Sequence, residues 1–226
     1  MYRADRFADR AEAGQALGAV VAQYLGPSGS GTRPLVTALP RGGVPVGAEV
    51  ARAIGADLDI VVARKIGLPW QPELGVGAVT ADGPPVLDRQ LLARVRLSEP
   101  ELRAAVDRER AEVYRRLRRY RGDRPPPVVA DRVVVVVDDG LATGVTARAA
   151  VASLRTAAPR QLIFAVPVCA PQSAQALRQE VDAVLWVLAP AGFHAVGEWY
   201  DDFRQLSDAQ VVSQLAAAWG TSPDCG

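Results

Sequence analysis

The sequence is poor in several residue types on which whole classes of protein depend. Its 226 residues include two cysteines, one histidine and one lysine. Cys169 lies in an apolar run and Cys225 next to the C-terminus, so neither a disulfide framework nor a thiolate metal site is indicated. No stretch reaches the roughly 18 apolar residues that a membrane-spanning helix needs, and the charged segment 1–14 lacks the apolar core of a signal peptide. These absences predict a cytoplasmic protein without membrane partners.

A large net charge is also missing. The formal charge is +1, with 49% apolar and 23% charged residues, which is typical of a folded globular protein. Such a balance gives no overall attraction to nucleic acid, so a nucleic-acid partner is not expected from it. The length fits one large domain at about 150 residues per domain, and no internal repeat or clear linker divides it. We therefore predict a single domain over residues 1–226.

Lysine is nearly absent although basic residues are not. Of the 26 basic residues 25 are arginine, and the one lysine, Lys65, follows Arg64. Arginine and lysine differ in shape and in donor geometry, so an isolated lysine in an arginine-rich chain suggests that a compact ammonium group is needed there. The alternative is that the single lysine occurs at this position by chance.

Apolar runs and helical spacings alternate along the chain. Helical spacing predicts helices in 6–25, 44–54, 98–121, 147–156 and 172–181, and apolar runs predict strands in 35–39, 58–63, 133–137, 162–168 and 183–188. This alternation predicts an α/β fold with a central parallel sheet flanked by helices. The uninterrupted Val133–Val137 is typical of a strand in the middle of such a sheet.

A second set of elements interrupts this alternation between residues 67 and 127. Gly75–Thr80 and Val86–Asp88 flank a turn at 81–83, which predicts a hairpin. The helix 98–121 begins at Ser98, a capping residue followed by Pro100, and ends before Pro125–Pro127. Segment 94–121 holds ten arginines and five acids, a charge of +5, which fits either a solvated helix face or a nucleic-acid patch.

The stretch Asp138–Thr146 carries the strongest chemical signal. Two acids end a buried strand, and a loop of small residues then leads into a helix. Backbone N–H groups at a helix N-terminus bind anions, and carboxylates at a strand end accept hydrogen bonds from sugar hydroxyls. A simple helix cap would explain the glycine and threonines, but not two adjacent like charges. The Gly-x-Gly-x-x-Gly spacing of a dinucleotide site is missing.

This stretch resembles the signature of the type I phosphoribosyltransferases, in which apolar residues precede two acids, three variable residues and Thr/Ser-Gly-x-Thr. Asp138, Asp139, Thr143, Gly144 and Thr146 fill the fixed positions. The resemblance implies binding of phosphoribosyl pyrophosphate by the whole loop, which comprises Asp138, Asp139, Gly140, Leu141, Ala142, Thr143, Gly144, Val145 and Thr146. Leu141 and Ala142 match the adenine-type loop, and Ala142 replaces the acid of hypoxanthine and guanine enzymes.

Two further segments stand in the order that the family shows. Arg41, Gly42 and Gly43 follow the first strand, where the family has its pyrophosphate-binding loop; taken alone the segment is equally well a plain turn. Arg64-Lys65 is similar to the Arg-Lys pair of adenine-type enzymes and implies a catalytic role at the pyrophosphate. The following stretch to about residue 88 would then be a flexible flap. A solvated strand end is the alternative for Arg64-Lys65.

The C-terminal segment 189–226 is, by the same resemblance, the hood that covers the acceptor. Phe193, Trp199 and Tyr200 could stack on an acceptor ring, or could simply form a small apolar cluster. His194 is interpreted as structural, because no nucleophile motif accompanies it.

The resemblance implies transfer of the phosphoribosyl group to a nitrogen acceptor, such as a salvaged nucleobase, with release of pyrophosphate. Mg²⁺ would be held through the substrate, bridging pyrophosphate and ribose oxygens, without a dedicated metal site in the protein and with Asp138 and Asp139 as candidate ligands. Arg64, Lys65, Asp138 and Asp139 would be the catalytic residues. The alternative is a non-catalytic regulator that senses phosphoribosyl pyrophosphate and binds nucleic acid or protein through helix 98–121. The acceptor and the oligomeric state, a homo-oligomer included, stay open.

Overall fold

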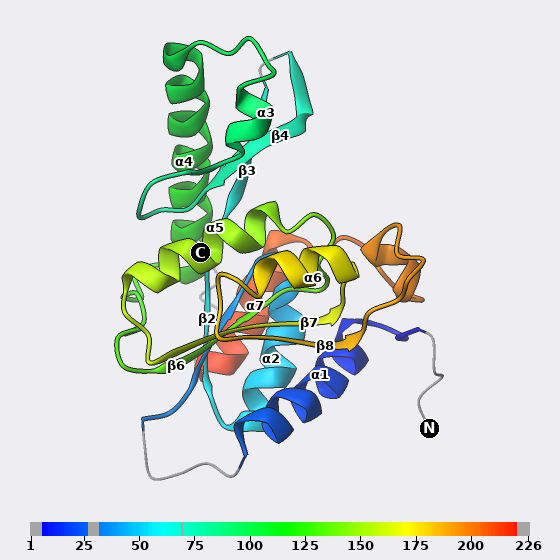
Figure 1. The fold of residues 1–226 in the computed structure, drawn as a ribbon. Coiled ribbons are helices and arrows are strands. Elements are labelled where there is room, and N and C mark those ends of the chain that lie inside the picture. The colour runs from blue at the N-terminus through cyan, green and yellow to red at the C-terminus, as the bar shows by residue number, and fades with distance from the viewer. Residues whose placement is uncertain (1–5, 27–31, 69, 221–226) are drawn as a thin grey trace.

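A parallel sheet of five strands forms the centre of the molecule (Figure 1). The computed structural model describes residues 6–26, 32–68 and 70–220. In spatial order the strands are β2 (Asp57–Ile60), β1 (Leu35–Ala38), β6 (Val133–Val137), β7 (Gln161–Val168) and β8 (Ala183–Leu188). Every neighbouring pair is parallel. The predicted α/β fold is confirmed, and β6 occupies the centre as its valine run indicated.

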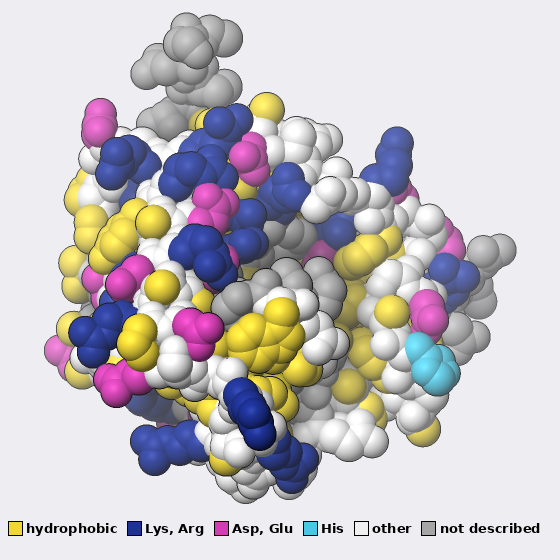
Figure 2. Space-filling view, turned by 90° about the horizontal axis from the view of Figure 1, so that it is seen from above, with side chains coloured by type: hydrophobic (Ala, Val, Ile, Leu, Met, Phe, Trp, Pro, Cys, Tyr) yellow, Lys and Arg dark blue, Asp and Glu magenta, His cyan; other side chains and the backbone are white. Residues whose placement is uncertain are grey.

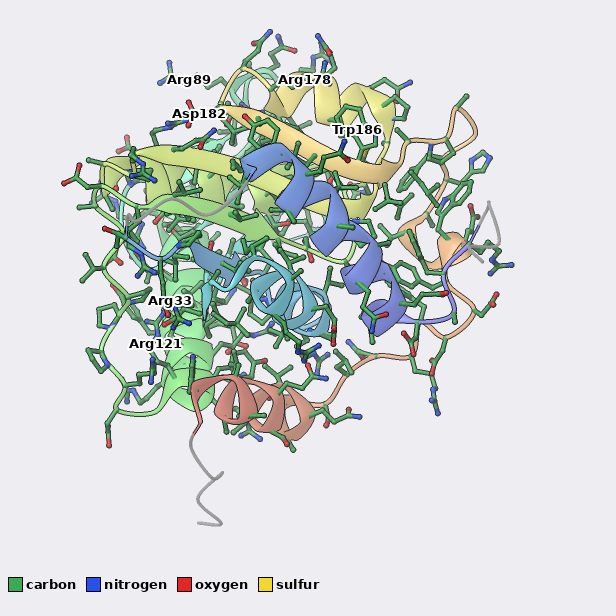
Figure 3. The ribbon with its side chains drawn as sticks, turned by 90° about the horizontal axis from the view of Figure 1, so that it is seen from below. Arg33, Arg89, Arg121, Arg178, Asp182 and Trp186 are labelled. Carbon is green, nitrogen blue, oxygen red and sulfur yellow. The ribbon has the colours of Figure 1, made fainter. Side chains whose placement is uncertain are left out.

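Helices cover both faces of this sheet. One layer contains α1 (Arg10–Leu25), α2 (Gly43–Ile54) and α7 (Asp208–Trp219), which Figure 3 shows from below; the other contains α5 (Val145–Thr156) and α6 (Pro171–Leu177). The valines of β6 alternate between the two layers: Val133, Val135 and Val137 join the core beside α2, and Val134 and Val136 join the core beside α5. This alternation is why β6 has no polar position.

Residues 64–121, which we call the projection, stand upright from one side of the sheet (Figure 1). They contain the antiparallel strands β3 (Arg64–Leu68), β4 (Gln71–Val79) and β5 (Val86–Leu87), then α3 (Arg89–Leu92) and α4 (Glu99–Arg121). The hairpin and the capping of α4 by Ser98 are as predicted, and Ser98 forms a capping box with Glu101. The predicted strand 58–63 was too long, because the chain leaves the main sheet at Ile60 and Arg64 opens β3, opposite Val79.

The C-terminal part differs most from the prediction. Helix α7 was missed, because its small and polar residues weaken the apolar pattern; only Val211, Leu215 and Ala216 are buried. Helix α6 ends at Leu177, earlier than predicted. Residues 27–31 of the glycine-rich loop, Pro69 of the flap, Cys225 and the last residues of the hood lie outside the described residues.

Cys169 is buried after β7, and burial raises the pKa of its thiol to about 11. The thiol therefore stays protonated near neutral pH and is a poor nucleophile. Among the helices of the described ranges, none combines the length and apolar character needed to cross a membrane.

Candidate functional site

The two acids of the predicted motif lie where the two central strands end side by side. A hydrogen bond of 2.8 Å from the Leu39 N–H to the Val137 carbonyl extends the pairing of β1 with β6 beyond the strands. The Pro40–Gly43 turn is therefore held against Asp138 and Asp139. Parallel α/β sheets bind ligands at this edge of the sheet.

Both glycines of that turn are required, because the end of β6 approaches Gly43 and the Asp139 carboxylate approaches Gly42. A Cβ atom on Gly43 would lie 2.7 Å from the Val137 carbonyl oxygen, and one on Gly42 would lie 1.8 Å from Oδ2 of Asp139. Real Cβ atoms do not approach backbone or carboxylate oxygens so closely. The peptide bond between Pro40 and Arg41 is cis. Two segments about a hundred residues apart thus form one compact surface.

The loop between Asp139 and α5 is anchored at Leu141. The Leu141 N–H donates to the Val168 carbonyl at 2.9 Å, and the Leu141 carbonyl accepts from the Ala170 N–H at 2.8 Å. On its other side, the hydroxyl of Ser173 donates to the carbonyl of Ala142. These bonds tie the start of the loop to the end of β7 and to α6.

The same loop presents unpaired donors. Within the described residues, the N–H groups of Ala142, Thr143 and Gly144 donate to no other group. Gly144 adopts φ +75° at the N-cap of α5, a conformation that favours glycine. Val145 and Thr146 begin the helix, and the first N–H groups of a helix have no intrahelical acceptor. These donors and the helix dipole are suited to binding an anion, and we call residues 142–146 the anion-binding loop.

The charged forms of Asp138 and Asp139 are energetically unfavourable at this position. Burial, and next the neighbouring Asp139 carboxylate, raise the pKa of Asp138 well above its usual value. Burial also raises the pKa of Asp139, although Arg10 opposes this effect. The Oδ1 atom of Asp138 accepts a bond of 2.9 Å from the Asp139 N–H. A ligand that brings a cation or hydroxyl donors would relieve this destabilised charge.

Arg10, at the start of α1, is a site residue that the sequence analysis missed. Its Nε atom donates to Oδ2 of Asp139 at 2.9 Å, and its guanidinium lies 4.0 Å from the centre of the Phe203 ring. The Arg10 side chain is 11% exposed and that of Asp139 16%. The two residues are 129 positions apart, so no local pattern could have paired them. The acids are consequently unequal, because Arg10 donates a hydrogen bond to Asp139 and acts on Asp138 only through charge attraction.

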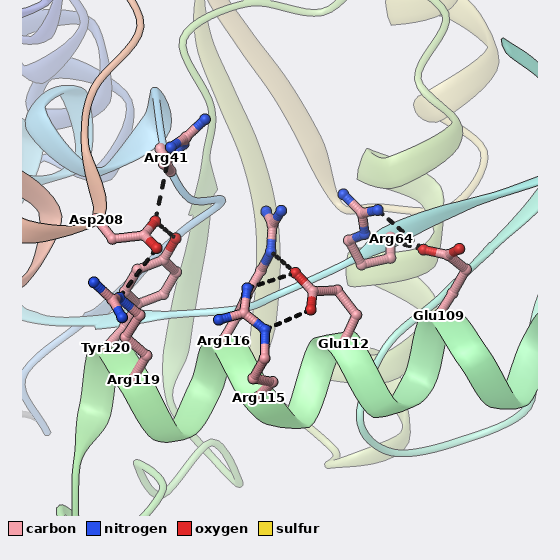
Figure 4. A network of polar contacts seen from close by, with 9 residues as sticks. All are labelled: Arg41, Arg64, Glu109, Glu112, Arg115, Arg116, Arg119, Tyr120 and Asp208. Atoms are coloured by element: carbon pink, nitrogen blue, oxygen red, sulfur yellow. Dashed lines mark hydrogen bonds and ion pairs between the residues drawn. The ribbon is translucent and has the colours of Figure 1, made fainter. Parts of the chain in front are cut away.

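Arg41, the basic residue of the turn, faces the end of the projection. Its Nη1 lies 3.8 Å from Oδ1 of Asp208, the first residue of α7. The same carboxylate accepts a bond of 2.6 Å from the Tyr120 hydroxyl and pairs with Arg119 at 3.0 Å (Figure 4). The bond from Tyr120 and these arginines lower the pKa of Asp208. The turn, α4 and α7 therefore meet at one carboxylate.

Arg64 and Lys65 begin β3 at the base of the projection. Arg64 donates from Nε and Nη2 to one oxygen of Glu109 on α4, at 3.1 and 3.0 Å (Figure 4). Lys65 is exposed, and the stem of its side chain passes over Gly75: a Cβ atom there would lie 2.7 Å from the Cγ and Cδ atoms of Lys65. These contacts place Arg64 against α4 and the stem of Lys65 along β4. The pair therefore belongs to the projection, whereas the turn and the acids belong to the sheet edge.

The hood lies over the other side of the acids, but its aromatic residues differ from one another. Tyr200 is 2% exposed, packs between Phe7 and Phe203, and donates from its hydroxyl to the Asp139 carbonyl at 2.6 Å. The stacking role expected of Tyr200 is therefore wrong, because the ring is buried and its hydroxyl supports the acidic loop.

Phe193 and Trp199 are only half-buried. The indole N–H of Trp199 is buried and has no hydrogen-bond partner within the described residues. A Cβ atom on Gly140 would lie 2.4 Å from a methyl group of Val196, so the hood also touches the loop after the acids. The surface is hollowed between the projection and the hood, on which His194 is exposed (Figure 2).

A dedicated metal cage is not visible in the described ranges, where no three Asp, Glu, His or Cys side chains gather. The Asp138–Asp139 pair is the set of oxygen donors that could contribute to binding a hard cation. Mg²⁺ is commonly held by one or two carboxylates together with substrate phosphates and water. The pair fits that mode of binding.

A central parallel strand that delivers two acids beside a glycine turn and an open helix N-terminus defines a fold of the phosphoribosyltransferase type. The comparison with known families agrees: the model of the phosphoribosyl transferase domain matches residues 4–196, and the chain belongs to that family.

Named relatives and a solved structure support this assignment. Two sequences from Mycobacterium tuberculosis strains, whose names assign them to the phosphoribosyl transferases, are 39% identical over 212 residues, which is 94% of this chain. The chain spans about half, 47%, of the length of these relatives. A crystal structure of a Thermus thermophilus protein superposes with a TM-score of 0.78 at 37% identity, covering 94% of this chain and 98% of the other.

Proposed function

We propose that the protein transfers the 5-phosphoribosyl group of phosphoribosyl pyrophosphate to a nitrogen acceptor, a nucleobase or similar ring, and releases pyrophosphate. The observation that carries the proposal is the convergence of three groups at one sheet edge. These are the acidic pair after β6, the glycine turn after β1 that contacts it, and the unpaired N–H groups before α5. They are matched to ribose hydroxyls, pyrophosphate and 5′-phosphate respectively.

The roles of the residues follow from their positions. The N–H groups of 142–146 would bind the 5′-phosphate, and the carboxylates of Asp138 and Asp139 would accept the ribose hydroxyls. Arg41 at the turn pairs with Asp208, and in this role it would exchange that carboxylate for a pyrophosphate oxygen, with Gly42 and Gly43 allowing the close approach of the pyrophosphate. The bond from the anomeric carbon to pyrophosphate breaks as the bond to nitrogen forms, so positive charge develops on the ribose ring. Two carboxylates near the ring stabilise that charge electrostatically.

Mg²⁺, if held by the acids and by the substrate, would neutralise negative charge on the pyrophosphate leaving group. The raised pKa values of Asp138 and Asp139 support such binding, because the carboxylates lack full compensation in the protein alone. A cation next to them would lower both pKa values and keep the pair charged.

Arg64 and Lys65 would act on the leaving pyrophosphate from the base of the projection. Arg64 is 35% exposed and holds Glu109, so in this role it would exchange the Glu109 carboxylate for a phosphate oxygen. Acceptor binding is assigned to the hood. Trp199 supports that assignment with an indole N–H that is buried and without a partner in the described part of the chain.

The test is an assay with Mg²⁺, phosphoribosyl pyrophosphate and a panel of purine and pyrimidine bases, with pyrophosphate release as the readout. Asp138→Asn should abolish release. Asp131→Asn is the matched control, because Asp131 is exposed at the opposite end of the same strand. Release that requires no base, or that survives Asp138→Asn, would refute the proposal.

The regulator alternative gains little from the arrangement of α4. Its arginines are largely paired within the protein: Arg115 and Arg116 with Glu112, Arg119 with Asp208, and Arg121 with Asp59. Asp59 and Asp208 lie outside segment 94–121 and are not included in its charge of +5, so their pairing leaves less charge for phosphate contacts than that count indicates. If the protein does not bind nucleic acid at low salt, the hypothesis of a nucleic-acid-binding regulator is refuted.

A further inference from the structure

A cavity of about 230 Å³ lies beneath the base of the projection, on the α5 side of the sheet. Its lining includes Thr37 of β1, Val62 after β2 and Ser153 near the end of α5. The anion-binding loop lies at the N-terminal end of α5, whereas Ser153 lies near the C-terminal end. At 1.5 Å per residue, the helix from Val145 to Ser153 separates the two places by roughly 12 Å. The cavity is therefore distinct from the proposed active site.

Residues of the projection cover this corner of the sheet. Thr37 and Asp59 are register partners on β1 and β2. Arg121, at the end of α4, reaches down to Asp59, donating to Oδ1 at 2.7 Å and to the Ile60 carbonyl at 3.1 Å. Pro126 and Pro127 complete the roof.

Thr37, one of the residues that line this cavity, has an unpaired polar atom. Thr37 is 1% exposed, and its Oγ1 has no hydrogen-bond partner among the described residues. A buried hydroxyl without a partner is unfavourable, so such groups are usually paired with protein, water or ligand. The nearby Thr80 hydroxyl differs, because it donates to the Asp82 carbonyl at 2.7 Å.

The rest of the lining limits what can enter. Val62, Leu117 and Leu154 are apolar, and Arg121 is already paired with Asp59. An anionic ligand would therefore find little compensation for its lost hydration, and a cationic one would meet only Asp82, which is exposed to solvent. Asp82, Pro126 and Thr156 are exposed at the cavity, which gives a small molecule a way in from solvent.

We propose that this cavity binds a neutral, ring-sized organic molecule that carries one hydroxyl or amide group and pairs it with Thr37. The size agrees, since an apolar cavity of about 150 Å³ accommodates benzene in another protein. The cavity here is larger, at about 230 Å³, and leaves room for a polar substituent.

The position of the cavity gives its ligand a regulatory consequence, which, unlike binding itself, rests on the proposed function. Its walls come from the sheet and from the projection, and Arg64 follows Val62 by two residues. A ligand that fixes the projection on the sheet would change the affinity for phosphoribosyl pyrophosphate. By linkage, phosphoribosyl pyrophosphate would change the affinity for that ligand by the same factor.

The test compares phenol with toluene, which has a similar shape but lacks the hydroxyl, in titrations of the ¹⁵N-labelled full chain followed by NMR. Phenol should bind about fivefold more tightly, as expected for one net hydrogen bond, and should shift the amides of Thr37 and of 153–157. Thr37→Val should remove this preference, Thr37→Ser should retain it, and Ser153→Phe, which fills the cavity, should abolish binding of both probes.

Equal binding of the two probes by the natural chain, or a preference unchanged in Thr37→Val, would overturn the proposal. So would the failure of phenol to saturate these amide shifts. If Thr37→Val fails to fold, the other two variants still test the proposal. Thr37→Ser must keep the preference for phenol over toluene, and Ser153→Phe must bind neither probe. Specific phenol binding without any binding of phosphoribosyl pyrophosphate would leave the cavity site standing and refute the proposed function instead.

Discussion

The ion pair between Arg10 and Asp139 makes a quantitative prediction about how the acidic site is held together. Arg10→Met keeps an unbranched side chain against Phe203 but leaves the Asp139 carboxylate without its cation. The two side chains are 11% and 16% exposed. Removal of one partner from a buried pair costs about 3–5 kcal/mol. Because these groups are not fully buried, we expect the low end, about 3 kcal/mol, or roughly 6–12 °C in Tm for a chain of this size.

The assay is thermal and urea unfolding of Arg10→Met, Asp139→Asn and the double variant. The double variant should be more stable than Arg10→Met, since it removes the charge that Arg10 had compensated, and the coupling energy should be about 2 kcal/mol. Arg52→Met is the matched control: Arg52 pairs with Glu49 one helical turn away and is 69% exposed, so its loss should cost less than about 1 kcal/mol. If Arg10→Met costs no more than Arg52→Met, or if the double variant gains nothing over Arg10→Met, the reasoning is refuted.

Three other changes test other parts of the site. Burial raises the pKa of Asp138, so the charge of Asp138 destabilises the fold as pH rises above the ordinary Asp pKa of 3.8. Asp138→Asn should therefore raise Tm at neutral pH, and the gain should shrink toward pH values of about 4. A loss of Tm at every pH would contradict this. Gly42→Ala would bring a Cβ atom within 1.8 Å of Asp139 Oδ2 and should lower Tm and affinity for phosphoribosyl pyrophosphate, whereas Gly192→Ala, with open space around it, should change neither. Lys65→Arg should reduce kcat by about tenfold or more while binding of phosphoribosyl pyrophosphate stays near normal, because arginine keeps the charge but not the shape of lysine; unchanged kcat would make the single lysine an accident.

The fold was largely accessible from the sequence because its signals are local. The five consecutive β-branched residues of Val133–Val137 predict a central strand. Ser98, a capping residue, predicts the start of α4. Helix α7 was missed because few of its residues are buried, so the apolar period is weak. The extent of β2 was missed for a different reason: the apolar run continues past Ile60, and only the three-dimensional pairing shows where the chain changes sheets.

The site was accessible only in part, since its long-range pairings leave no local trace. The Asp138–Thr146 loop can be found because its residues are consecutive. Neither the Arg10–Asp139 pair nor the Tyr200 hydroxyl bond to Asp139 has any such pattern. Tyr200 illustrates the difficulty. The sequence shows an aromatic residue in a polar segment, and this pattern is the same whether the ring faces a ligand or packs in the core.

The central claim, that Asp138 and Asp139 serve a phosphorylated sugar rather than the fold, is tested most directly by isothermal titration of phosphoribosyl pyrophosphate with Mg²⁺. We predict saturable binding by the natural chain and by the control Asp131→Asn. Asp138→Asn should bind at least about tenfold more weakly, a loss of about 1.4 kcal/mol, at unchanged or higher Tm. Normal affinity in Asp138→Asn together with a clearly lower Tm would show that the acid is structural, and would contradict the account.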